Sequence, residues 1–206
     1  MSVIIAVAYY YGQKKKRETS IQNLLNYFAH STYDHLTVNE IIWDICRNCI
    51  SSLNFEDCVI YLLDEERKVL SQKAAYGPKS PQPFEIFNPI EIPLGKGIVG
   101  SVAASGEAVI VNDTSRDPRY IVDDRRRLSE ISVPLIHKGG VIGVIDAENS
   151  RKNFFTQQHL QTMQTIASLC SAKISQALAH EAIQESKMEV MELNMKMTES
   201  RFLNLR

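Results

Sequence analysis

The cysteines are the residues of this chain with the most direct capacity for chemistry. Cys46 and Cys49 form one Cys-x-x-Cys pair, while Cys58 and Cys170 stand apart from it. Such a pair can act as a redox couple or supply two of the four ligands of a structural zinc site. No second pair completes a ligand set, so the spacing disfavours metal binding.

The segment around the Cys-x-x-Cys pair favours a structural role for both thiols. Apolar residues recur there at helical spacing: Ile41, Ile42, Ile45, Cys46, Cys49, Ile50 and Leu53. We therefore predict that both thiols face a core as small hydrophobic groups, with redox switching as the alternative. Reduced thiols are typical of a cytosolic setting.

Other reactive residue types form no recognisable site in the sequence. The five histidines have no metal-ligand spacing: His30, His35, His137, His159 and His180. We expect surface or helix-packing roles for them. A catalytic triad or carboxylate pair is assembled in space, so its spacing along one chain does not show it.

Charge excludes one class of partner. The 206 residues are 44% apolar and 23% charged, with a formal net charge of -1, which gives no electrostatic basis for binding nucleic acid. The arginines Arg125, Arg126 and Arg127 could contact an anionic ligand, but a solvated loop face is the favoured interpretation.

A glycine pattern opens the most informative stretch, Ile92 to Asn149. Gly95, Gly97 and Gly100 match the spacing of a dinucleotide-binding fingerprint, but the following strand leads into an antiparallel hairpin and not a parallel βαβ unit. These glycines instead permit positive φ and close backbone approach at the start of a helix over 97–105. Gly106 is predicted to end that helix.

Strands are predicted on both sides of this helix. The β-branched segments Ile131–Ile136 and Val141–Ala147 should pair as a hairpin through a turn at His137–Gly140. Further strands are expected at Glu56–Asp64, Lys68–Gly77 and Ala108–Val111. Residues 112–120 should form a shaped loop, because Asp117 precedes Pro118.

The stretch from Ile92 to Asn149 resembles the GAF domain, a small-molecule-sensing module of signalling proteins. The similarity extends over about Ile21 to Ala179. It implies an α+β fold with a central antiparallel sheet of about six strands and helices on both faces. A helix from Ile21 and the C-terminal helix would cover one face. The pocket would lie on the other, beneath helix 97–105 and the loops 77–89 and 112–129.

That location implies ten candidate ligand contacts: Tyr61, Tyr76, Phe84, Phe87, Ile98, Val102, Asp113, Tyr120, Ser129 and Ser132. Polar members would orient a ligand and apolar members would bury it. Phe84 and Phe87 could line the cavity or plug it. The ligand and any cofactor are not identified by the sequence.

Two ligand classes of the family are disfavoured. Cyclic-nucleotide-binding members carry Asn-Lys, then Phe, then Asp three residues later, whereas here Asn149 precedes Ser150 and Phe155 is followed by Gln158. Attachment of a bilin requires a pocket cysteine, and none occurs between Val59 and Leu169.

The N-terminus, residues 1–18, is predicted to be the end of a membrane anchor and a basic linker. The apolar run Val3–Tyr11 is far shorter than the about 20 residues needed to span a bilayer. Basic residues follow at Lys14–Arg17, as they do at the cytoplasmic end of a transmembrane helix. This predicts a location at the inner face of the plasma membrane. A packed or disordered terminus of a soluble protein is the alternative.

After the sensory domain, residues 19–180, a signalling helix is predicted over 181–206. No proline or glycine occurs from Thr156 onward, so one helix of about 50 residues is plausible. Apolar residues return at steps of three and four on both sides of a polar break at Glu181 and Gln184, which predicts a parallel homodimeric coiled coil. Residues 199–206 resemble the stretch before the phosphoacceptor of membrane sensor histidine kinases.

The leading hypothesis is therefore a non-catalytic regulatory module of a two-component system. It would bind an unknown small molecule, dimerise through its N- and C-terminal helices and pass the ligand state to a histidine kinase. One alternative is a GAF-type free methionine sulfoxide reductase, whose pocket thiolate only Cys58 could supply. The other is a ligand-free dimerisation spacer.

Overall fold

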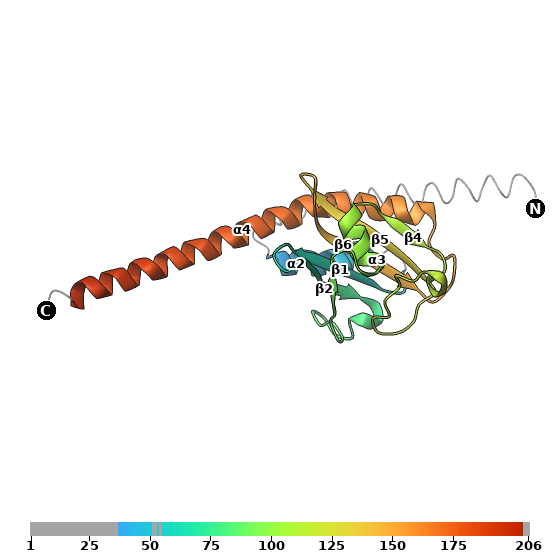
Figure 1. The fold of residues 1–206 in the computed structure, drawn as a ribbon, viewed down its shortest axis with the longest axis horizontal. Coiled ribbons are helices and arrows are strands. Elements are labelled where there is room, and N and C mark those ends of the chain that lie inside the picture. Colours follow the sequence, from blue (N-terminus) through green and yellow to red (C-terminus); the bar gives the residue numbers. More distant parts are fainter. Residues whose placement is uncertain (1–36, 51–52, 54, 204–206) are drawn as a thin grey trace, which may run out of the picture.

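One six-stranded antiparallel sheet forms the centre of the molecule (Figure 1). The computed structural model describes residues 37–50, 53 and 55–203, without the side chains of 48–50 and 198–203. The strand order is β3-β2-β1-β6-β5-β4. The strands are β1 (Cys58–Asp64), β2 (Val69–Tyr76), β3 (Glu91–Pro93), β4 (Val109–Val111), β5 (Ser129–His137) and β6 (Gly140–Asn149).

Helices cover both faces of this sheet, which confirms the predicted α+β fold. Helix α2 (Val38–Asp44), its π-helical continuation (Ile45–Ile50) and the first half of α4 (Gln157–Leu203) lie on one face. Helix α3 (Gly97–Ser105) lies on the other. The predicted helix from Ile21 and the predicted anchor at residues 1–18 lie outside the described residues.

The strands send alternate side chains to the two faces, because a strand has a period of two. On β1, Cys58 and Ile60 pack toward α2 and α4, whereas Val59 and Tyr61 pack toward α3. Cys46, Cys58 and Cys170 are fully buried on the α2 and α4 side. The predicted core position of Cys46 is confirmed, and the side chain of Cys49 lies outside the described part.

Backbone geometry confirms both predicted ends of α3. Gly97 has φ +67° at its first residue, and Gly106 has φ +71° immediately after its last. The Gly106 N–H donates to the Val102 carbonyl at 2.8 Å, which ends the helix in the left-handed conformation that glycine favours. The β5–β6 hairpin likewise turns through Lys138 and Gly139, both with positive φ.

Gly143 is the tightest backbone position in the hairpin, and replacing it should destabilise the fold. A Cβ there would lie 2.2 Å from the Tyr61 carbonyl oxygen of β1. We expect Gly143→Ala to lower the free energy of unfolding by about 2–4 kcal/mol, measured by urea denaturation. Gly140→Ala is the control, because its nearest contact would be an ordinary 3.7 Å. Equal midpoints for the two variants would contradict this packing.

Helix α4 is much longer than the sheet that it covers. Its 47 residues extend about 70 Å, and its second half projects away from the domain (Figure 1). The described part of the chain contains no helix with both the length and the apolar character needed to cross a membrane.

Candidate ligand-binding site

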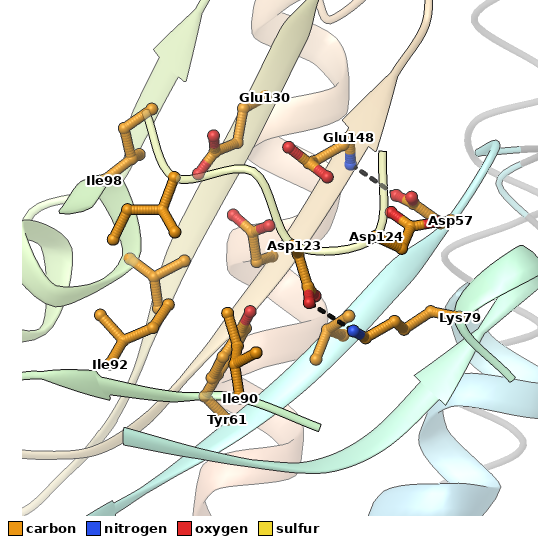
Figure 2. A pocket seen from close by; sticks show the side chains of 14 residues that line it. Asp57, Tyr61, Lys79, Ile90, Ile92, Ile98, Asp123, Asp124, Glu130 and Glu148 are labelled. Atoms are coloured by element: carbon orange, nitrogen blue, oxygen red, sulfur yellow. Dashed lines mark hydrogen bonds and ion pairs between the residues drawn. The ribbon is translucent and has the colours of Figure 1, made fainter. Parts of the chain in front are cut away.

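A small cavity lies on the α3 side of the sheet, beneath the segments that follow β2 and β4 (Figure 2). Its volume is about 20 Å³, which is room for one or two water molecules. Side chains from the strands, from α3 and from the loops enclose it: Asp57, Val59, Tyr61, Lys79, Ile90, Ile92, Ile98, Val99, Ile121, Asp123, Asp124, Glu130, Asp146 and Glu148.

Carboxylates from two adjacent strands form the floor of the cavity. Glu130 of β5 lies directly opposite Glu148 of β6, and Ser132 lies opposite Asp146. These residues are two apart on each strand, so their side chains leave the same face of the sheet. The Ser132 hydroxyl donates a hydrogen bond to the Asp146 carboxylate, and all four residues are buried.

An ion pair joins the two segments above this floor. Lys79 follows β2 and pairs with Asp123 of the segment between β4 and β5 (Figure 2). The Lys79 ammonium also donates to the Asn88 carbonyl at 3.1 Å. The Gln72 amide donates to Asp123 at 2.5 Å and to the Tyr61 hydroxyl at 2.9 Å. The two segments are therefore tied together over the cavity and to the sheet beneath.

A fully buried arginine supports one side of the cavity. The Arg127 guanidinium lies 2.5 Å from Asp57, 2.7 Å from Asp124 and 3.2 Å from Glu56. The prediction of a solvated arginine face is wrong for Arg127, because these carboxylates draw its side chain inward. It holds for Arg125 and Arg126, which are exposed.

Burial raises the pKa values of the carboxyl groups around the cavity. The pKa of Asp57 rises to about 6 through burial, against the opposing attraction of Arg127. Burial also raises the pKa of Asp146 to about 7 and that of Glu148 to about 9, and for Glu148 the charge of Asp146 adds to the effect. The pKa of Glu130 is raised for the same two reasons. Some of these carboxyls therefore keep their protons at neutral pH.

The three carboxylates closest to one another are poorly suited to a metal ion. Oxygens of Asp57, Asp124 and Glu148 lie within 4.8 Å of one another, close enough to share an ion. The Arg127 guanidinium already binds two of these three residues. A divalent cation would have to share that space with a fixed positive charge, which is unfavourable.

Comparison with known proteins decides the family. The family model described as "GAF domain" matches residues 35–175, which is more than half of the chain. The chain belongs to the GAF domain family. The fold therefore confirms the resemblance that the glycine pattern and hairpin indicate.

Two kinds of protein occur among the relatives of this GAF domain. The free methionine-R-sulfoxide reductase of Saccharomyces cerevisiae is 41% identical over 58 residues, 28% of this chain and 32% of that protein. The Neisseria meningitidis enzyme of the same name, solved with its substrate, has a TM-score of 0.64 and 22% identity, covering 75% of this chain and 86% of the other. The GAF domain of an Acinetobacter phosphoenolpyruvate-protein phosphotransferase has a TM-score of 0.67 and 20% identity, covering 81% and 98%.

These comparisons correct one prediction. The chain was expected to be non-catalytic, but several relatives and structural neighbours of this GAF domain are enzymes that reduce free methionine-R-sulfoxide. The chain spans less than half the length of the curated relatives that it matches. At these identities the solved structures show a shared fold.

The structure brings two of the ten predicted contacts to the cavity, Tyr61 and Ile98. Tyr76 packs against the core on the α2 and α4 side, and Val102 is a buried residue of α3 itself. Phe84 and Phe87 are 57% and 50% exposed. They neither line nor plug the cavity, and the Phe84 ring instead lies 5.5 Å from that of Trp43.

The four remaining predicted residues stabilise the surrounding loops. Asp113 binds Lys152 at 2.8 Å and caps a short 3-10 turn. The Tyr120 hydroxyl accepts the Arg127 N–H at 2.9 Å, and Ser129 donates to the Arg151 carbonyl at 2.8 Å. Ser132 lies on β5 outside the lining, and its hydroxyl donates to Asp146, which lines the cavity.

Sequence reasoning missed most of the charged lining. Lys79, Asp123, Glu130, Asp146 and Glu148 were not among the predicted contacts. A signal for the floor was present, because acidic residues alternate with apolar ones where β5 begins and β6 ends. A carboxylate on a buried strand has few functions that do not involve a ligand or an ion pair.

Proposed function

We propose that this GAF domain binds a small zwitterionic amino acid in the acidic cavity, with free methionine sulfoxide as the leading ligand. The observation that carries the proposal is the charge of the lining. Among the described residues, six carboxyl groups surround the cavity and Lys79 is the single lining cation. A ligand ammonium would be attracted to the carboxylates, and a ligand carboxylate to Lys79.

The remaining lining suits the rest of such a ligand. Ile92, Ile98, Val99 and Ile121 supply apolar surface for a short alkyl chain. Protonated Glu148 or Glu130 can donate a hydrogen bond to a neutral acceptor such as a sulfoxide oxygen. The free methionine-R-sulfoxide reductases among the relatives support this ligand class.

Binding requires the cavity to open, because about 20 Å³ cannot hold an amino acid. The Lys79–Asp123 ion pair joins the two segments that must separate. A ligand ammonium could take over the position beside Asp123 while its carboxylate keeps Lys79 paired. Opening would then replace the Lys79–Asp123 ion pair by one ion pair between Asp123 and the ligand and another between Lys79 and the ligand. Asp123 would not be left buried without a cation.

Reduction would need a further group. Converting a sulfoxide into a thioether consumes two electrons and two protons and releases water, and two thiols can supply both by forming a disulfide. Cys46, Cys58 and Cys170 lie on the opposite face of the sheet from the cavity. Ligand binding is therefore tested separately from reduction. Reduction is assayed on the same protein, with dithiothreitol supplying the electrons.

Calorimetric titration with free L-methionine-R-sulfoxide tests the proposal. We expect saturable 1:1 binding by the wild-type protein and at least tenfold weaker binding by Glu148→Gln, because a ligand ammonium would favour the ionised form of Glu148 and glutamine cannot ionise. Glu107→Gln is the matched control, because Glu107 is exposed and lies outside the cavity. Failure of the wild type to bind this and other free amino acids would contradict the proposal. Formation of methionine in the dithiothreitol assay would add reductase activity to it.

Ligand sensing coupled to an output domain is a second candidate function, favoured by the projection of α4 beyond the sheet. In that case the cavity would set the packing of α4, and the helix would transmit it. A histidine kinase output, an anchor at residues 1–18 and a location at the inner face of the plasma membrane stay predictions.

A further inference from the structure

The second half of α4 carries an apolar surface that nothing in the described chain covers. Upstream, Ala167, Cys170, Ile174 and Ala177 are buried against the domain. Downstream, eight large apolar side chains are exposed: Leu178, Ile183, Met188, Val190, Met191, Leu193, Met195 and Met197. Exposed apolar surface of this extent marks an interaction site.

Seven of these eight residues, all but Leu178, form two stripes with the spacing of a coiled coil. The first continues the buried upstream stripe through Met188, Met191 and Met195, at alternating steps of three and four. The second runs through Ile183, Val190, Leu193 and Met197. At about 100° per residue, the two stripes lie on nearly opposite sides of the helix.

Charge distinguishes between the stripes. In a parallel coiled coil, the residue just before the first core position of a heptad (position g) lies near the residue five positions later (position e) on the other helix. Beside the first stripe this places Lys187 of one copy near Glu192 of the second, and the twofold symmetry repeats the contact. Beside the second stripe it places Glu189 near Asn194, a pair without charge attraction. An antiparallel pair through the first stripe would bring Glu185 and Glu192 together.

The polar interruption of the first stripe has an intramolecular cause. The Glu181 carboxylate accepts the Val38 N–H at 2.8 Å, at the start of α2. Glu181 therefore holds α2 against α4 and marks the point at which α4 leaves its own domain. The interruption is a contact within the chain and does not require a shift between two registers.

We propose that α4 pairs with α4 of a second copy of this chain, in parallel and in register, through Met188, Met191 and Met195. Lys187 and Glu192 set the orientation. Within one copy Glu192 also binds Lys196 at 2.6 Å, so it would lie between two ammonium groups in the pair. This inference is independent of the ligand proposed for the cavity, because none of these residues lies there.

Charge exchange in the full chain tests the orientation by sedimentation equilibrium. We expect the wild type to sediment as a dimer of the 23.3 kDa chain. Lys187→Glu should weaken the dimer by at least about tenfold, because each of two attractive contacts becomes repulsive. Adding Glu192→Lys should restore it to within about threefold. A monomeric wild type, or a dimer unaffected by Lys187→Glu, would overturn the proposal.

Disulfide crosslinking tests the seam. Met188→Cys should form an intermolecular disulfide on mild oxidation, since equivalent core positions of a parallel pair lie side by side. Glu189→Cys, one residue away on the helix, is the control and should remain at the wild-type background. More efficient crosslinking by Leu193→Cys than by Met188→Cys would place the second stripe at the seam and overturn the assignment.

Discussion

Arg127→Met should lower the free energy of unfolding by about 3–5 kcal/mol at pH 8, the loss typical of removing one partner of a buried ion pair. The Arg127 guanidinium lies fully buried among Asp57, Asp124 and Glu56. Without it, Asp57 would remain buried as a carboxylate that has lost its ion-pair partner. Methionine fills similar space, so the loss would come from charge and not from a cavity.

The pH dependence of this loss identifies its cause. Burial already raises the pKa of Asp57 to about 6 while Arg127 opposes the rise, so removing Arg127 should raise that pKa further. At pH 5 the carboxyl can take up a proton, and the difference between variant and wild type should shrink. Urea denaturation at pH 5 and pH 8 measures both values.

Two further variants separate charge from shape. Arg126→Met is the matched control, because Arg126 is the exposed neighbour and its loss should change stability by less than about 0.5 kcal/mol. Arg127→Lys keeps the positive charge but loses the planar N–H donors of the guanidinium. We therefore expect a loss of stability between those of Arg126→Met and Arg127→Met. An Arg127→Met protein as stable as Arg126→Met would show that the buried arginine contributes no net stabilisation.

The wild-type protein should become less stable as pH rises from 5 to 9. Glu148 has a folded-state pKa of about 9 and Asp146 one of about 7, both above their values of 4.5 and 3.8 without burial. As pH rises, the unfolded state therefore loses these protons before the folded state does, so it binds fewer protons over this pH range. Stability from such a group is fully present below its unfolded pKa and is lost as pH rises through its folded pKa.

Glu148→Gln should reverse part of that loss. Each raised carboxyl contributes a slope on the order of 1.4 kcal/mol per pH unit between its two pKa values. Glutamine keeps the shape of the side chain but cannot ionise. We expect the variant to be more stable than wild type at pH 9 and similar to it at pH 5.

Denaturation across pH 5, 7 and 9 measures this slope, with Glu107→Gln as the control that should follow wild type. Parallel stability profiles for wild type and Glu148→Gln would contradict an ionisable, buried Glu148. If Glu148→Gln gains stability at pH 9 and also loses ligand binding, Glu148 lowers the stability of the protein but contributes to binding.

The sequence predicted two turn positions correctly but did not predict which of three neighbouring arginines is buried. Gly106 and the Lys138–Gly139 turn were predictable, because positive φ is a local demand that the residue type reveals. The segment over 125–127 was not, because all three arginines have the same type, and only the position of Arg127 among Asp57, Asp124 and Glu56 buries its side chain.

The sequence by itself determined the fold class, the ends of α3, the hairpin and the length of α4, since these depend on residue type and periodicity along one segment. Tertiary structure alone decided the cavity, because its charges come from segments as far apart as Asp57, Lys79, Asp123 and Glu148. Burial and pKa are properties of neighbours in space. A strand pattern shows that Glu148 shares a face with Asp146, but only the packed sheet and the closed loops remove both from water.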